Sequence, residues 1–218
     1  MGSCNTTQKE LGGKDLLLRT CIEKTYATTD TSDSITSTAH GLVVGDIVKP
    51  SSIGTLTSID VNTFYFVINV PDANSFKIAT LPSGTAIVMD DTTTGLKLDA
   101  FVLVGGLRSK SFSFSSESID ITNQESGEWK TMLDGSGMRS VSMSGSGVYT
   151  AEVAFREVRQ AFLDNKLICF MFQDAKNNEL IEGCFKISSL EVSGDYDAEG
   201  QYSIGADSSG PVVFFQAA

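Results

Sequence analysis

The sequence predicts a mainly β protein with one flanking α-helix, and three observations support this fold class. Short apolar runs alternate with polar residues at the two-residue period of half-buried strands. Clusters of Gly, Asn, Asp, Pro and Ser separate these runs at short intervals, as turns do. Only residues 151–163 carry apolar side chains at helical spacing over several turns. The combination favours a β-sandwich or barrel.

The first expected strand covers residues 14–26 and follows a polar arm, residues 1–13. A run of Thr, Ser and Asp comes next, and this shift in composition is typical of a flexible join. Further short strands with polar turns between them are expected at 47–50, 64–70, 75–80, 85–89 and 96–98. We therefore interpret residues 27–98 as an inserted small all-β domain. It divides a main domain of residues 1–26 and 99–218, and its removal is expected to leave the main domain folded.

Serine alternates with apolar residues on two strands of the main domain. Phe112 and Phe114 have serines on either side, and so do Val141 and Met143. The Gly-rich segment 123–137 between the two strands is expected to be a long loop. Two serine-faced strands without a nucleophile–base pair predict a hydrated and chemically inert surface.

The apolar pattern changes its parity shortly after the first of these strands. Ile119 and Ile121 continue the alternation out of step with Phe112 and Phe114. One extra residue near Ser115–Ser116 would reconcile the two patterns, so a β-bulge is expected there.

The helix at 151–163 has one apolar face and a suitable start. Thr150 can cap its N-terminus, and Glu152 lies in the first turn, where the helix dipole favours an acid. The apolar face consists of Ala151, Ala154, Phe155, Val158 and Phe162. The strands expected after the helix cover 166–173, 180–192, 201–206 and 211–215.

The net charge of −11 argues against stable binding to DNA or RNA, because an acidic protein repels the phosphate backbone. No apolar run is long enough to span a membrane, so no membrane insertion is expected. The four cysteines are widely spaced and without a histidine partner, which predicts buried free thiols.

Candidate catalytic and metal-binding residues are few. His40, the only histidine, lies in a turn-like Ala-His-Gly context and is interpreted as a packing residue. The oxygen-rich segment 195–200 lacks the spacing of a calcium loop and is interpreted as a hydrated hairpin turn. We therefore expect no catalytic residue, no cofactor and no metal site.

Three segments of the chain resemble the major tail tube proteins of long-tailed bacteriophages and gene-transfer-agent particles. They are GGKDLLLR near the N-terminus, GLRSKSFSFSSESIDITNQESGEWKTML with SVSMSGSGVY in the middle, and the C-terminal GCFKISSLEVSGDYDAEGQYSIGADSSGPVVF. The resemblance covers residues 12–26 and 101–218, and the inserted residues depart from the compact members. The insertion itself resembles a small β module that recurs in phage structural proteins.

The resemblance implies a structural subunit that forms six-fold rings, stacked into a hollow conduit for DNA. Implied partners are further copies of the chain and the tape-measure, tail-terminator and baseplate or distal tail proteins, while DNA passes without sticking. The resemblance also implies that the protein is made in the cytoplasm of the bacterial host and becomes part of the virion tail. The loop carrying Trp129, Met132 and Leu133 is expected to contact neighbouring subunits. Glu117 and Asp120 are expected to lie near the lumen. The insertion is expected on the outer surface of the tube, and the tail is expected to be non-contractile.

An alternative function is a bacterial β-sandwich module that recognises carbohydrate or a cell surface through the insertion. Phe64, Tyr65 and Phe66 beside Asn62 and Asn69 are its only aromatic candidates. Their alternation indicates a buried strand more simply than a binding site.

Overall fold

The structure, a computed structural model, describes residues 15–28, 33–149, 153–194, 197 and 199–216. Its strands form one antiparallel sheet in the order β2-β5-β4-β3-β6-β1-β9-β10-β11-β8-β7, with β12 paired to β10. The mainly β prediction is therefore confirmed. The elements are β1 (Leu16–Thr28), β2 (Ile35–Thr36), β3 (Ile47–Ser52), β4 (Tyr65–Asp72), β5 (Ser75–Ala79), β6 (Thr94–Leu103), β7 (Leu107–Ser116), β8 (Arg139–Val148), α1 (Val153–Leu163), β9 (Leu167–Asp174), β10 (Glu179–Ser193), β11 (Gln201–Ser208) and β12 (Val213–Gln216).

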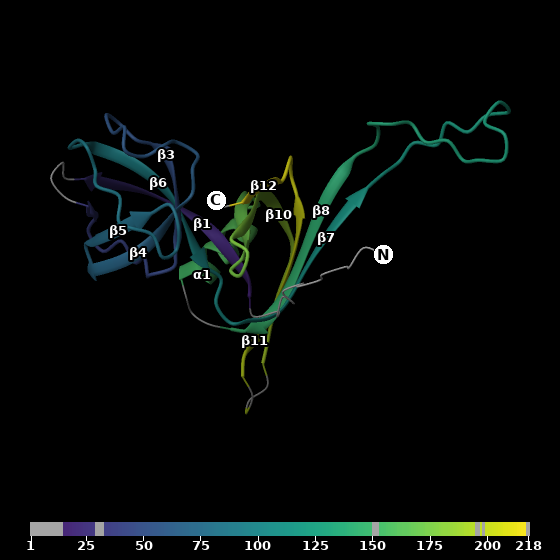
Figure 1. The fold of residues 1–218 in the computed structure, drawn as a ribbon. Helices are drawn as coiled ribbons and strands as arrows, with labels where there is room; N and C mark the ends of the chain where they lie inside the picture. Colours follow the sequence, from purple (N-terminus) through teal and green to yellow (C-terminus); the bar gives the residue numbers. More distant parts are fainter. Residues whose placement is uncertain (1–14, 29–32, 150–152, 195–196, 198, 217–218) are drawn as a thin grey trace, which may run out of the picture.

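Six of these strands close into a small barrel at one end of the molecule (Figure 1). Closure occurs because β2 pairs with β5 on one side and with β1 on the other. The interior is filled with aliphatic and aromatic side chains, among them Val48, Tyr65, Val67, Phe76 and Ile78. A closed barrel leaves none of its strands with an open edge over the paired residues.

β1 and β6 are long because they belong both to the barrel and to the rest of the sheet. Their register runs without interruption from Arg19 opposite Leu103 to Tyr26 opposite Leu96. The expectation of flexible joins is therefore wrong for the described residues, since paired strands connect the inserted segment to the remainder. The strand expected at 85–89 is also absent, and this stretch is irregular.

A packed interface holds the barrel against the remaining sheet. Phe101 on β6 and Met171 on β9 pack with Ile47, Phe64 and Phe66 from the barrel. Apolar area removed from water at such an interface contributes roughly 25 cal/mol per Å². The barrel is consequently fixed in orientation by side-chain packing as well as by the shared strands.

A buried arginine reinforces this interface. The Arg19 guanidinium donates to Asp46 Oδ1 (3.1 Å) and to the backbone oxygens of Gly45 (2.8 Å) and Phe101 (3.1 Å), while its Nε donates to Gln173 Oε1 (2.8 Å). Burial raises the pKa of Asp46, while hydrogen bonds from Val43 and Arg19 oppose that shift. Burial also lowers the pKa of Arg19. Both shifts report the cost of removing the two charges from water.

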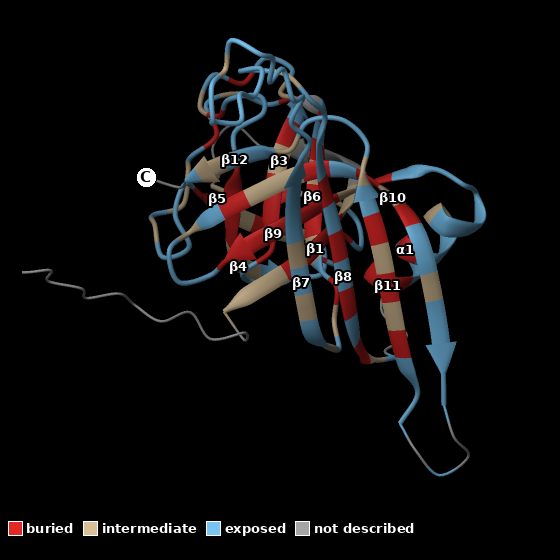
Figure 2. Cartoon of the chain, turned by 90° about the vertical axis from the view of Figure 1, so that its right-hand side faces the viewer, coloured by how far each residue is buried: buried red, intermediate tan, exposed pale blue. Residues whose placement is uncertain are grey.

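The second half of the molecule is the β9-β10-β11-β8-β7 part of the same sheet, with α1 packed against β9 and β10. Figure 2 shows buried residues alternating with exposed ones along β8 and with intermediate ones along most of β11, as the period of a strand requires. Ala154, Phe155 and Val158 of α1 are buried against this core, whereas Phe162 is 39% exposed. The predicted cap Thr150, together with Ala151 and Glu152, lies outside the described residues.

Two expectations about local detail are wrong. Ser115 and Ser116 pair regularly with Ser140 and Arg139, and the β7–β8 register shifts near Arg108 instead. Ile119 and Ile121 lie beyond the end of β7, so their parity needs no bulge. Cys184 is exposed and Cys21 and Cys169 are half-buried, so the expectation of buried thiols is wrong for these three residues.

Candidate assembly surfaces

One face of the sheet β7–β8–β11–β10 is built mainly from serine. The pairing register places Ser111 opposite Ser144, and Ser113 opposite Ser142, which in turn faces Asp207. The opposite face carries Phe112, Val141 and Met143 toward the core. The exposed serines that β7 and β8 contribute to this face are Ser109, Ser111, Ser113, Ser115, Ser140, Ser142, Ser144 and Ser146. The predicted alternation of serine with apolar residues is therefore confirmed for these two strands, and the hydration of this face stays a prediction.

The carboxylates of this serine face were not singled out from the sequence. Asp207 on β11 is exposed beside Ser142, and Glu191 on β10 is exposed opposite Ser203. The alternation of Tyr202, Ile204 and Ala206 toward the core could have revealed Asp207. Glu191 could not be assigned in the same way, because a register shift between Ile187 and Ser189 changes the parity of β10.

This four-stranded segment has two open edges within the described residues. β7 pairs with β8 alone. On the other side, the β9–β10 pairing ends at Leu167 and Lys186, so residues 189–193 of β10 pair with β11 alone. Both edges expose large apolar side chains, Phe114 (54%) on β7 and Val192 (55%) on β10. Open edges of this kind are templates for pairing with another chain.

The backbone groups of β7 that face the open edge can be identified. Val141 N–H donates to Ser208 Oγ (2.9 Å), so the backbone of Val141 is turned toward β11. Phe114 lies directly opposite Val141. In an antiparallel ladder the two members of such a pair turn their backbone groups away from each other. The N–H and C=O of Phe114 are therefore directed outward from the sheet.

Residues 117–138 form an arm that extends well away from the body of the protein (Figure 1). Backbone hydrogen bonds join its two branches, from Glu117 N–H to Met138 O, from Leu133 N–H to Ile119 O, and from Ile121 N–H to Thr131 O. Gly137 is required at its base, because a Cβ there would collide with the carbonyl oxygen of Glu117. The arm is thus a loose extension of the β7–β8 hairpin.

All three residues predicted to contact a neighbouring subunit lie on this arm. Trp129 is 82% exposed, and Met132 and Leu133 are exposed as well. Glu117 and Asp120, predicted near a lumen, also lie on the arm, at and beyond the end of β7, rather than on the serine face itself. Hydrogen bonds from the Thr122 hydroxyl and N–H hold the pKa of Asp120 below its usual value, with a smaller contribution from Lys130.

The one histidine has a structural role. His40 is buried, its Nδ1 accepts from Leu42 N–H (3.0 Å), and its Nε2 lies 3.3 Å from the carbonyl oxygens of Asp72 and Ser75. Because Nδ1 is an acceptor, Nε2 carries the proton and donates to these carbonyls. The ring also packs on Phe76 at 5.0 Å. The interpretation of His40 as a packing residue agrees with this geometry.

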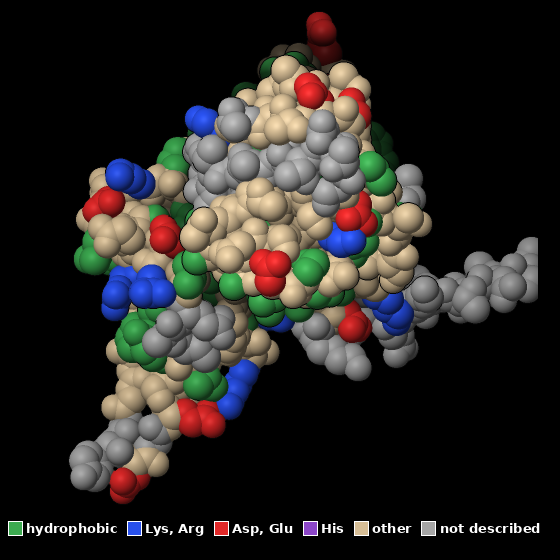
Figure 3. Space-filling view, turned by 90° about the vertical axis from the view of Figure 1, so that its left-hand side faces the viewer, with side chains coloured by type: hydrophobic (Ala, Val, Ile, Leu, Met, Phe, Trp, Pro, Cys, Tyr) green, Lys and Arg blue, Asp and Glu red, His purple; other side chains and the backbone are tan. Residues whose placement is uncertain are grey.

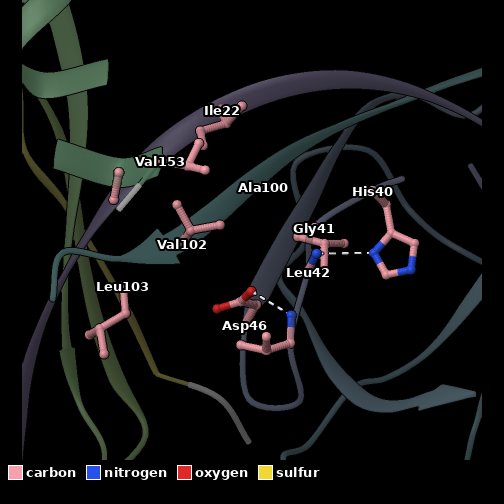
Figure 4. A pocket seen from close by; sticks show the side chains of 11 residues that line it. Ile22, His40, Gly41, Leu42, Asp46, Ala100, Val102, Leu103 and Val153 are labelled. Carbon is pink, nitrogen blue, oxygen red and sulfur yellow. Dashed lines mark hydrogen bonds between the residues drawn. The ribbon is translucent and has the colours of Figure 1, made fainter. Parts of the chain in front are cut away.

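A cavity of about 390 Å³ lies between the barrel and the start of α1 (Figure 4). Its polar groups are already engaged: Asp46 accepts from Val43 N–H (2.9 Å) and from Arg19, and His40 accepts from Leu42. The rest of the lining is largely aliphatic, including Ile22, Val102 and Val153.

Within the described part of the chain, no group of three His, Cys, Asp or Glu side chains could hold a metal ion. None of its helices is long and apolar enough to cross a membrane.

Comparison with known proteins identifies the family. A family model described as "Phage tail tube protein" matches residues 83–214, which extend from before β6 into β12. The chain belongs to the phage tail tube proteins. It is a structural protein of the virion tail and not an enzyme. No curated protein matches the chain.

Two solved structures resemble this tail tube protein. One is described as "Virion of native gene transfer agent (GTA) particle", with 32% sequence identity and a TM-score of 0.50 over 53% of this chain and 88% of that chain. The other, "Tail of empty GTA particle computed with helical refinement, C6 symmetry", has 33% identity and a TM-score of 0.50 over 53% and 86% of the two chains.

The proposed carbohydrate-binding aromatics do not form a surface. Phe64, Tyr65 and Phe66 are all buried, and Tyr65 accepts a hydrogen bond from the backbone of Asp60. The structure thus agrees with the simpler interpretation of this segment as a buried strand, and the alternative function loses its only candidate site.

Proposed function

We propose that this tail tube protein assembles into six-fold rings that stack into a hollow tube for DNA delivery. The observation that carries the proposal is the pair of open edges on the sheet β7–β8–β11–β10. The similar gene transfer agent tail was described with C6 symmetry, which supports the same ring symmetry for this chain.

The direction of the strands permits ring closure. Successive pairs β7–β8, β8–β11 and β11–β10 are all antiparallel, so β7 and β10 run in opposite directions. The β7 edge of one copy can therefore continue the antiparallel ladder onto residues 189–193 of β10 in the next copy. Repeating this contact around a ring closes the sheets into one barrel and removes every open edge.

In this arrangement the serine face lines the lumen. Its opposite face is already covered by the core of the subunit, so only the serine face is free to surround the DNA. Hydroxyl groups keep the wall hydrated, and the carboxylates of Asp207 and Glu191 repel the phosphates. Glu117 and Asp120 extend this negative surface at the point where the arm leaves β7 and the wall of the tube. DNA consequently passes without binding.

The arm provides contact between copies in the axial direction. Trp129, Met132 and Leu133 are exposed far from the apolar core of their own chain, and large aromatic residues are enriched at the centres of protein interfaces. Stacking of identical rings is a heterologous contact that does not close, so it generates a tube of many rings.

The barrel that contains the inserted residues 27–98 lies on the outer surface of the tube in this proposal. On the visible part of the barrel face in Figure 3, charged side chains are few and scattered, and hydrophobic ones form small groups. Such a face suits exposure to solvent, and an outward barrel on each subunit leaves little room for a contractile sheath. The tail is therefore proposed to be non-contractile. The subunit is made in the host cytoplasm and joins tape-measure, terminator and baseplate or distal tail proteins.

A proline at the β7 edge tests the ring contact. Phe114→Pro removes an N–H that faces outward, which an isolated subunit tolerates because proline is accepted on edge strands. Phe114→Ala loses the same side chain but keeps the N–H and is the matched control. We expect rings and tubes in electron micrographs of Phe114→Ala and only folded monomers, verified by circular dichroism, for Phe114→Pro. Equal assembly of the two variants would contradict pairing at this edge.

A further inference from the structure

Three cysteines lie in one row across three neighbouring strands. Cys169 on β9 is directly opposite Cys184 on β10. The β1–β9 register ends with Thr20 opposite Phe170, and one further step brings Cys21 opposite Cys169. Residues directly opposite each other project from the same face of a sheet. All three side chains line a single cavity of about 580 Å³.

The hydrogen-bond pattern distinguishes the two neighbours of Cys169. Ser209 N–H donates to Cys184 O (2.8 Å), so the backbone of Cys184 is turned away from β9. Cys169 and Cys184 are therefore a non-hydrogen-bonded pair, in which the Cα atoms approach to about 4.5 Å and the side chains are closest. This separation falls within the range of about 4.4–6.8 Å found in disulfides.

The geometry between Cys169 and Cys21 is less favourable for a disulfide. Val104 N–H donates to Leu18 O (2.9 Å), so the backbone of Leu18 is turned toward β6. Alternation along β1 then turns the backbone of Cys21 toward β9, as in a hydrogen-bonded pair. The Cα atoms of such pairs are about 5.5 Å apart, and their side chains are farther from each other. Cys169 thus has one preferred partner, Cys184.

We propose that Cys169 and Cys184 form an oxidation site that closes into a disulfide within one chain, across β9 and β10. The exposed Cys184 reacts first: its thiolate attacks a small-molecule disulfide such as oxidised glutathione, forms a mixed disulfide and releases one glutathione thiolate. Cys169 then loses its proton and attacks the Cys184 sulfur, which releases the second glutathione. Two protein thiols are oxidised, and one glutathione disulfide is reduced to two thiols.

The surroundings of Cys169 account for this order. Burial raises the pKa of Cys169, and the nearby Glu182 carboxylate adds to the effect. The thiol of Cys169 also donates to Glu182 Oε1 at 3.5 Å. A thiol held in its protonated form is a weak nucleophile, so Cys169 attacks only when a disulfide is placed directly beside it. This part of the inference rests on the proposed function in the tail: the two thiols stay reduced in the cytoplasm, and the disulfide forms once the particle meets an oxidising medium.

The experiment treats purified protein with oxidised glutathione and counts free thiols after denaturation. In a Cys4→Ser background the three remaining thiols are expected to fall to one, with a mass loss of two hydrogens and no linked dimer on a non-reducing gel. Peptide mapping should place the bond between Cys169 and Cys184.

Cys21→Ser, the matched control, should still form the disulfide, whereas Cys169→Ser should stop at the mixed disulfide on Cys184. A bond between Cys21 and Cys169, or a wild-type protein that stops at the mixed disulfide, would overturn the proposal. Neither result depends on tube formation.

Discussion

Arg19 is the residue on which the attachment of the barrel depends most directly. Its guanidinium is buried and contacts Asp46 and Gly45 from the barrel together with Phe101 and Gln173. Removing one partner of a buried ion pair leaves the other charge without compensation, which costs about 3–5 kcal/mol. We therefore predict that Asp46→Ala lowers the free energy of unfolding by about that amount, measured by urea denaturation.

An exposed ion pair of the same chemistry is the control. Arg108 and Glu199 are 2.7 Å apart, and both side chains are more than half exposed. Glu199→Ala should change the free energy of unfolding by less than about 1 kcal/mol, because solvent screens such pairs. Equal effects of the two substitutions would mean that the Arg19 cluster does not hold the barrel. The sequence contains a hint of this role, since Arg19 interrupts an apolar run, but its partners are distant in the chain.

At the scale of the elements, local pattern predicted much and long-range pairing little. Alternation predicted β7, β8 and the serine face, and helical spacing predicted α1, because these signals lie within about ten residues. Closure of the barrel depends on β2 meeting both β1 and β5, which no local pattern encodes. The exposed Ile119 and Ile121 suggested a bulge because apolar residues on an arm resemble a continued strand.

The arm is the element whose removal should separate folding from assembly. Glu117 N–H donates to Met138 O, so a two-residue Asn-Gly turn can replace residues 118–137 at this hydrogen-bonded pair. We predict a folded subunit that no longer forms tubes, measured by circular dichroism and sedimentation. The arm makes no contribution to the buried core, which is why folding should survive.

A point-substituted arm distinguishes apolar contact from arm length. Trp129→Ala combined with Met132→Ala and Leu133→Ala should abolish tubes as well, whereas Gln124→Ala on the same arm should not. Normal tubes from the shortened arm or from the triple variant would assign stacking to another surface.

At the scale of the whole molecule, the barrel and the main sheet share strands and a core. Ala27 lies opposite Thr94, so an Asn-Gly turn in place of residues 28–93 would preserve the β1–β6 ladder. The deletion would nevertheless uncover Phe101, Met171 and Leu180 and remove Asp46 from Arg19. We predict a lower urea midpoint and stronger binding of a hydrophobic dye than for the full chain. An unchanged midpoint without dye binding would show that the barrel adds nothing to the stability of the sheet.

The shared strands also determine the order in which the chain can fold during synthesis. Every strand of the barrel lies within residues 16–103, so the barrel can close while the C-terminal half is still on the ribosome. The outer side of β1 then waits for β9, about 150 residues later in the chain, and such distant pairing forms slowly. The β10 edge used between subunits is completed later still, since β10 and β11 are synthesised after β9. A nascent chain therefore holds a finished barrel long before it can join a neighbour, which delays premature association until the subunit is whole.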